Sequence, residues 1–203
     1  MTVAGSAFNT SGNLVLNSGL NTSTFGGAIT GLATINGGGG ALTVGGGTLT
    51  LSQGLTGTGN FTQSAGTVVI DSSTVALAGL TSYNAGGGTL SLTRATAQDL
   101  QLDGGETFFN LTVGSNGGAV TTSGGNGIAV SNNLSVQGNL TLGGTASTVG
   151  GTLTVTTLDT LNTNGLGLAV TGVATVDGAL SHSAGTLSFA NTLTGTAGTL
   201  TLT

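Results

Sequence analysis

The side chains best suited to chemistry gather in one short segment of this 203-residue chain. Four of its seven charged residues lie within thirteen positions: Arg94, Asp99, Asp103 and Glu106. Carboxylates beside a base suit polysaccharide binding or cleavage, and carboxylate oxygens are also ligands for Ca²⁺. Their spacing fixes no mutual geometry, and exposed ion pairs contribute little to stability. We therefore expect a solvated polar surface cluster at a wide turn, with no catalytic, metal-binding or cofactor-binding residue.

The only histidine and the few aromatic side chains are the next candidates. His182 stands between two serines, but no motif indicates the geometry of a Ser–His–Asp triad, so we expect a surface or turn histidine. Phe108 and Phe109 are adjacent, so in a strand one points inward and one outward. The outward phenylalanine and Tyr83 are weak candidates for carbohydrate stacking.

Composition excludes several classes of function. The chain has one basic residue, no Cys, no Pro and 41 glycines. A single cation gives no basis for phosphate recognition, so we expect no nucleic-acid partner. Without Cys there is no disulfide framework and no thiolate zinc site. No apolar run is long enough for a membrane-spanning helix, and the sequence as a whole predicts a non-enzymatic protein.

Short strands must position all of these side chains. Thr, Val and Leu alternate in brief runs between Gly and Asn clusters, which is typical of strands and turns. An apolar–polar–apolar triplet recurs along the chain at Leu14/Leu16, Leu42/Val44, Leu49/Leu51, Val68/Ile70, Leu90/Leu92, Leu111/Val113, Leu134/Val136, Leu140/Leu142, Leu153/Val155, Leu166/Leu168, Leu187/Phe189 and Leu200/Leu202. The period of two places Leu and Val on one face and Thr and Ser on the other.

The spacing of the triplets predicts the architecture. Successive steps from Leu49 through Val68, Leu90, Leu111 and Leu134 to Leu153 are 19, 22, 21, 23 and 19 residues. A repeat near 20 residues with two or three strands fits one coil of a solenoid. We predict an all-β, right-handed parallel β-helix (β-solenoid) of about ten coils of roughly 20 residues, forming one domain over residues 1–203.

The same pattern predicts what the two ends of the rod do. Gly and Asn supply tight corners, and we see no charged or amphipathic cap in either terminal coil. Uncapped coils expose strand edges that can template further pairing. We expect the chain to be a segment of a longer array or a subunit that stacks end to end. The residues expected to form the stacking surfaces are Val3, Leu14, Leu16, Leu187, Phe189, Leu200 and Leu202.

Two segments resemble repeats of known bacterial exoproteins. They are 107–115 (TFFNLTVGS) and 130–142 (VSNNLSVQGNLTL), and 47–51 (GTLTL) and 185–189 (GTLSF) look like the same kind of coil. The resemblance is to filamentous-haemagglutinin-like and autotransporter-passenger β-solenoids of bacterial surfaces, and it covers nearly the whole chain. It implies export to the cell surface, with a role in adhesion, in a matrix or in a filament.

Outward threonines offer an alternative function. Each of three sets projects from one strand face, namely Thr48/Thr50, Thr152/Thr154/Thr156 and Thr199/Thr201/Thr203, and a flat threonine ladder is the ice-binding surface of some β-solenoid antifreeze proteins. By spacing, these pairs do not recur in every coil at one phase, so we rank ice binding second.

We therefore expect a structural extracellular rod of a bacterial surface adhesin or self-assembling filament. Its expected partners are copies of itself or neighbouring repeats of the same exoprotein, with surface glycans and host or matrix proteins as further candidates. Two alternatives stay open: an ice-binding β-solenoid and a polysaccharide-active β-helix enzyme. The expected location is extracellular or on the bacterial cell surface, although the chain carries no secretion signal.

Overall fold

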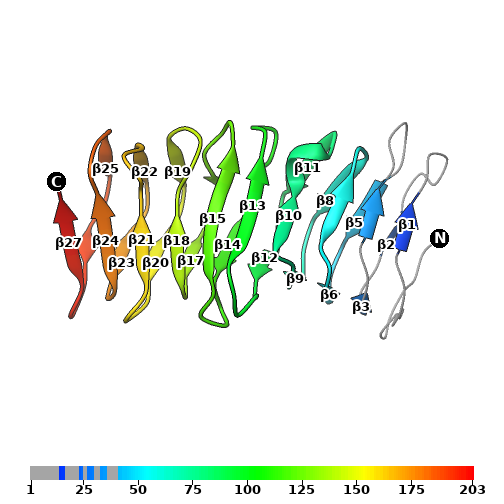
Figure 1. Ribbon diagram of the computed structural model, residues 1–203, viewed down its shortest axis with the longest axis horizontal. Helices are drawn as coiled ribbons and strands as arrows, with labels where there is room; N and C mark the ends of the chain where they lie inside the picture. The colour runs from blue at the N-terminus through cyan, green and yellow to red at the C-terminus, as the bar shows by residue number, and fades with distance from the viewer. Residues whose placement is uncertain (1–13, 17–22, 25–26, 30–32, 36–40) are drawn as a thin grey trace.

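The computed structural model describes residues 14–16, 23–24, 27–29, 33–35 and 41–203. Its described elements are short β-strands and one 3-10 turn, η1 (Leu77–Gly79). Every pairing between described strands is parallel, and the strands pair with counterparts about 20 residues away along the chain. This arrangement is a β-solenoid, as the repeat predicts (Figure 1).

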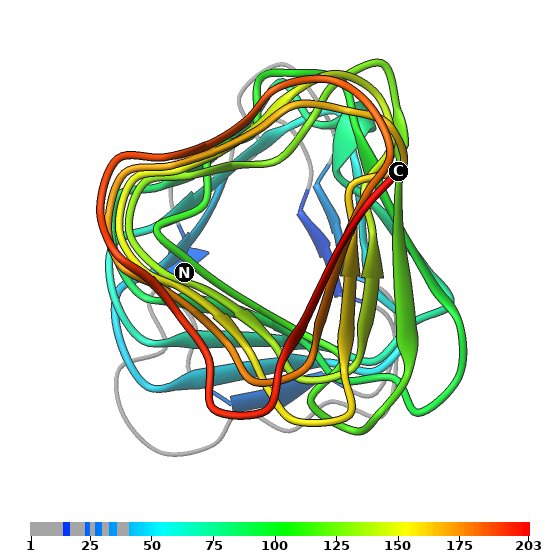
Figure 2. The same ribbon diagram turned by 90° about the vertical axis from the view of Figure 1, so that its left-hand side faces the viewer.

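Each turn of the solenoid contributes strands to three faces (Figure 2). The first face consists of β2 (Ser23–Thr24), β5 (Ala41–Val44), β8 (Asn60–Gln63), β11 (Ser82–Ala85), β16 (Ala129–Val130), β19 (Ser147–Val149), β22 (Leu168–Val170) and β25 (Leu187–Phe189). These strands form two four-stranded sheets, and single bridges at Thr107 and Phe108 link them.

The second face is one continuous nine-stranded sheet. It consists of β3 (Gly27–Ile29), β6 (Thr48–Leu51), β9 (Thr67–Ile70), β12 (Thr89–Leu92), β14 (Asn110–Val113), β17 (Leu134–Val136), β20 (Leu153–Val155), β23 (Ala174–Val176) and β26 (Leu193–Thr194).

The third face holds a three-stranded and a seven-stranded sheet, which meet where β7 lies beside β10. Its strands are β1 (Leu14–Leu16), β4 (Ala33–Ile35), β7 (Leu55–Gly57), β10 (Thr74–Ala76), β13 (Gln98–Leu102), β15 (Ala119–Gly124), β18 (Asn139–Thr141), β21 (Thr160–Asn162), β24 (Ala179–His182) and β27 (Thr199–Leu202).

The number of turns is smaller than the sequence predicts. Gly27 and Leu193 occupy equivalent positions at the two ends of the nine-stranded sheet. The described rod therefore has about eight turns of about 21 residues, slightly fewer than the ten coils that the sequence predicts for the chain. The C-terminal end faces the viewer in Figure 2, and the chain winds anticlockwise toward that end, which makes the solenoid right-handed.

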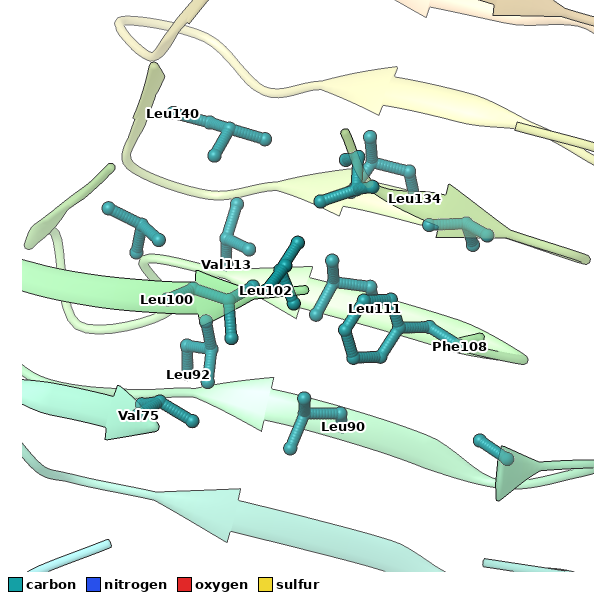
Figure 3. Close-up of a cluster of buried hydrophobic side chains, with 14 of the residues drawn as sticks. Val75, Leu90, Leu92, Leu100, Leu102, Phe108, Leu111, Val113, Leu134 and Leu140 are labelled. Atoms are coloured by element: carbon teal, nitrogen blue, oxygen red, sulfur yellow. The ribbon is translucent and has the colours of Figure 1, made fainter. Parts of the chain in front are cut away.

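The core is a set of apolar columns that run along the rod. On the second face Leu90, Leu111 and Leu134 lie in register on successive strands and are almost completely buried (Figure 3). Burial of such a side chain contributes roughly 1.5–3 kcal/mol. Because each turn covers the interior side chains of its neighbours, stability is a sum over adjacent turns.

Glycines form corners that other residues do not tolerate. Gly66 has φ +74°, and a Cβ there would lie 2.5 Å from the carbonyl oxygen of Gly47 in the turn below. Gly46 differs, since a Cβ there would meet nothing within 4 Å. Among the described residues, no helix is long and apolar enough to span a membrane.

Candidate functional site: the C-terminal turn and the outer surface

The predicted polar cluster is spread along one strand. Arg94 precedes β13 and pairs weakly with Asp71, with 3.8 Å between Nη1 and Oδ1. Asp99 lies on β13 and accepts a hydrogen bond from Gln101 at 2.9 Å. Asp103 follows the far end of β13, so Arg94 and Asp103 stand at opposite ends of the strand.

Glu106 has a structural role in the turn after β13. Its carboxylate accepts hydrogen bonds from the backbone N–H groups of Asp103, at 3.1 and 3.2 Å, and of Gly104, at 2.9 Å. The side chain is 7% exposed, so its oxygens are used to hold the turn closed. Within the described part of the chain, no three His, Asp or Glu side chains come together as a metal site.

His182 lies in the core, so the expectation of a surface or turn histidine is wrong. It follows Leu180 at the inward phase of β24 and is 8% exposed. Its Nδ1 lies 2.8 Å from the hydroxyl oxygen of Thr163, which is fully buried. The histidine therefore packs inside the last turns of the rod.

The aromatic side chains also point inward. Tyr83 is 1% exposed, so the prediction that it stacks on a carbohydrate is wrong. Its ring stacks on Phe61 at 4.8 Å and lies 5.3 Å from the ring of Phe108 at an angle of 51°. Phe108 is fully buried, and Phe109 is partly buried and packs against the same hydrophobic core. Burial raises the pKa of Tyr83 far above its ordinary value.

Within the described structure, no further turn covers the interior side chains of the C-terminal turn. Leu200 is 46% exposed, whereas Leu180, its register partner one turn earlier, is 1% exposed. Leu202 is 63% exposed above His182, and Leu193 is 38% exposed above the fully buried Ala174. These leucines have the inward phase of the core columns but lie at the open end of the rod.

The open end has a shallow apolar cavity. It measures about 370 Å³ and is lined by Val176, Leu180, Leu193, Leu200 and neighbouring backbone. Leu187 and Phe189, on β25, are partly buried against the same core. A hydrogen bond from the Thr196 N–H to Asp177, at 2.8 Å, fastens the last corner and lowers the pKa of Asp177.

The structure describes most but not all of the predicted stacking residues. Leu187, Phe189, Leu200 and Leu202 lie together on the C-terminal turn. Leu14 and Leu16 lie on β1, which pairs with β4 and is the outermost described strand of the third face, while Val3 lies outside the described residues. Leu193 was not among the predicted stacking residues. Its spacing of seven residues from Leu200 could have identified it as an inward residue of the same turn.

The threonine pairs of the second face share one phase but do not recur in every turn. Thr50 and Thr154 belong to one column of the nine-stranded sheet, because each register step from β6 to β20 aligns the middle residue of one strand with that of the next. On this face the turns between them carry no Thr-x-Thr pair, as the sequence predicts, and the column there holds Val69, Ser91, Thr112 and Ser135. The pair Thr199/Thr201 belongs to the third face.

Comparison of the chain with protein-family models, curated proteins and solved structures gives no match.

Proposed function

We propose that this protein is a structural rod that lengthens by stacking its C-terminal turn on the first turn of another copy. The observation that carries the proposal is the exposure of Leu193, Leu200 and Leu202, whose register partners one turn earlier are buried. A further turn in the same register covers them as each turn covers the one before it. The free backbone edge of β27 offers the matching hydrogen bonds.

The strand directions suit head-to-tail assembly. β27 and β1 both belong to the third face, at opposite ends of the described rod (Figure 1). A second copy stacked in the same direction on the C-terminal turn keeps the parallel orientation used throughout the described solenoid. Two different surfaces then meet, and such a contact does not close on itself, so the product is a filament.

The surface and the interior support a mechanical role. The core is continuous along the rod, and the described lateral faces carry hydroxyls and amides with few charges. Adhesin or filament function on a bacterial surface, outside the cell, is the setting that the resemblance to exoprotein repeats implies. In that setting the partners are other copies or neighbouring repeats, together with glycans or matrix proteins along the lateral faces.

A charge at the open end tests the stacking. Leu200→Lys places an ammonium where an added turn would have to desolvate it, so assembly should need at least about tenfold more protein. The matched control is Leu158→Lys, because Leu158 is 95% exposed at a lateral corner of the rod. Sedimentation velocity over a concentration series measures both variants beside the wild type.

The expected result is a series of growing species for the wild type and Leu158→Lys, and single rods for Leu200→Lys. Circular dichroism should show the same strand content in all three proteins, because Leu200 is already half exposed. Identical assembly of the wild type and Leu200→Lys would overturn the proposal, and so would a wild type that stays monomeric at every concentration.

The two alternatives differ in their support. The described carboxylates give no positive evidence for a polysaccharide-active enzyme, because Glu106 closes a turn and Asp99 bonds to a neighbouring side chain. Ice binding gains a specific observation, namely the aligned columns of the second face, and it is a second candidate function.

A further inference from the structure

Two columns of small polar side chains run along the outer surface of the second face. The inner column, at the middle of each strand, is Thr50, Val69, Ser91, Thr112, Ser135, Thr154, Thr175 and Thr194. The flanking column, two residues earlier in each turn, is Thr48, Thr67, Thr89, Asn110, Asn133, Thr152, Val173 and Thr192. Together they form an array two residues wide and eight strands long.

The array is regular in two dimensions. Neighbouring strands of a sheet lie about 4.7–4.9 Å apart, and residues two apart on a strand lie about 6.6 Å apart. Twelve of the sixteen positions carry Thr or Asn and two carry Ser, and only Val69 and Val173 lack a hydrogen-bonding side chain. The array therefore presents small polar groups at regular spacing on eight of the nine strands of the sheet.

Three threonine hydroxyls of the inner column are available to an outside ligand, whereas Ser135, Thr152 and Thr194 make hydrogen bonds within the protein. Thr50, Thr112 and Thr154 are half-buried between their column neighbours, and within the described residues their side chains make no hydrogen bond. Each presents a hydroxyl that donates and accepts, together with a methyl group. Neither column contains a charged or aromatic side chain.

We propose that the second face binds ice, with the two columns ordering water at the spacing of a crystal lattice. A ligand that matches a periodic array must itself be periodic, and the spacing between neighbouring strands is close to an oxygen–oxygen repeat of ice. The alternating methyl and hydroxyl groups order water between them without the strong, lattice-disrupting hydration of a charge. The lack of aromatic rings disfavours a glycan, because sugars stack on exposed aromatic faces.

The other two faces are poorer arrays. The equivalent column of the third face contains Asp99 between Thr74 and Thr121. The first face is divided into two sheets, and its outer column includes Ala129 and Ala169. The second face alone, among the described faces, is one uninterrupted sheet with uncharged columns in register.

A bulky side chain on one face, compared with the same change on another, tests the assignment. Thr112→Tyr places a bulky ring at the centre of the array, and Thr154→Tyr places one two turns further along the same column. The matched control is Thr121→Tyr on β15, an exposed outward position of the third face. Tyrosine is well tolerated on strand surfaces, and circular dichroism checks the fold of every variant.

Thermal hysteresis and inhibition of ice recrystallisation are the measurements. We expect activity for the wild type and Thr121→Tyr, and at least a severalfold loss for Thr112→Tyr and Thr154→Tyr. No activity from folded wild type, or an equal loss in all three variants, would overturn the inference. Leu200→Lys should keep activity as a single rod, so the failure of ice binding and the failure of stacking are separate results.

Discussion

At the scale of single residues, Tyr83 shows how tightly the interior is packed. Its ring lies between Phe61 and Phe108, and its hydroxyl finds no hydrogen-bond partner within the described residues. An unsatisfied buried hydroxyl costs about 1–3 kcal/mol. Because the ring contacts survive in Phe, Tyr83→Phe should raise the free energy of unfolding at neutral pH by about 1 kcal/mol.

The same residue gives a pH dependence of known sign. Burial raises the pKa of Tyr83 in the folded state. Above the ordinary pKa the tyrosine therefore ionises in the unfolded chain but stays neutral in the folded protein, and this difference favours unfolding. Stability should be full below the ordinary value of 10.0 and fall as the pH rises above it. Urea unfolding on both sides of that value measures this, and Tyr83→Phe should lose less stability at alkaline pH. An equal loss in both proteins would show that another group controls alkaline unfolding.

At the scale of elements, the corners decide whether successive strands stay in register. Gly66→Ala should lower the free energy of unfolding by about 1–3 kcal/mol, because φ is positive and the new Cβ meets the backbone of the turn below. Gly46→Ala is the matched control. A Cβ at Gly46 meets no atom within 4 Å, so this change should alter stability little. Chemical denaturation measures both. Similar losses of stability in the two variants would mean that the positive φ and the close backbone contact at Gly66 do not explain the need for glycine there.

The sequence predicts the strands better than it predicts the sites. Leu90, Leu111 and Leu134 are inward as expected, because a period of two in a strand identifies the buried face. The same period places His182 in phase with Leu180, yet a surface or turn position is expected because no motif indicates a catalytic triad. Residue type misled there, because a polar side chain can be buried when a neighbour such as Thr163 satisfies it.

Register across turns on the second face could be predicted from the spacing of the apolar triplets. The steps that run from Leu49 to Leu153 join the residues that the sheet aligns, although turn lengths vary by several residues. The relative positions of the charged residues could not be predicted in this way. Arg94 and Asp103 are near in sequence, but β13 separates them, and Arg94 instead pairs with Asp71 from the preceding turn.

At the scale of the whole molecule, the protein is a rod whose stability comes from contacts between adjacent turns. About eight turns at about 4.8 Å each give a described length of about 40 Å. The same contacts that join turn to turn inside the chain are available at its C-terminal end, where Leu200 and Leu202 remain exposed. The proposed assembly repeats the internal architecture and needs no new kind of interface.

Electron microscopy of the purified wild-type protein over a range of concentrations tests this central claim most directly. The account predicts unbranched filaments of constant width, whose lengths are multiples of one rod and grow with concentration. It also predicts that the parallel strand spacing continues across each junction between copies. Separate rods of single-chain length at every concentration, with no end-to-end contacts, would contradict it.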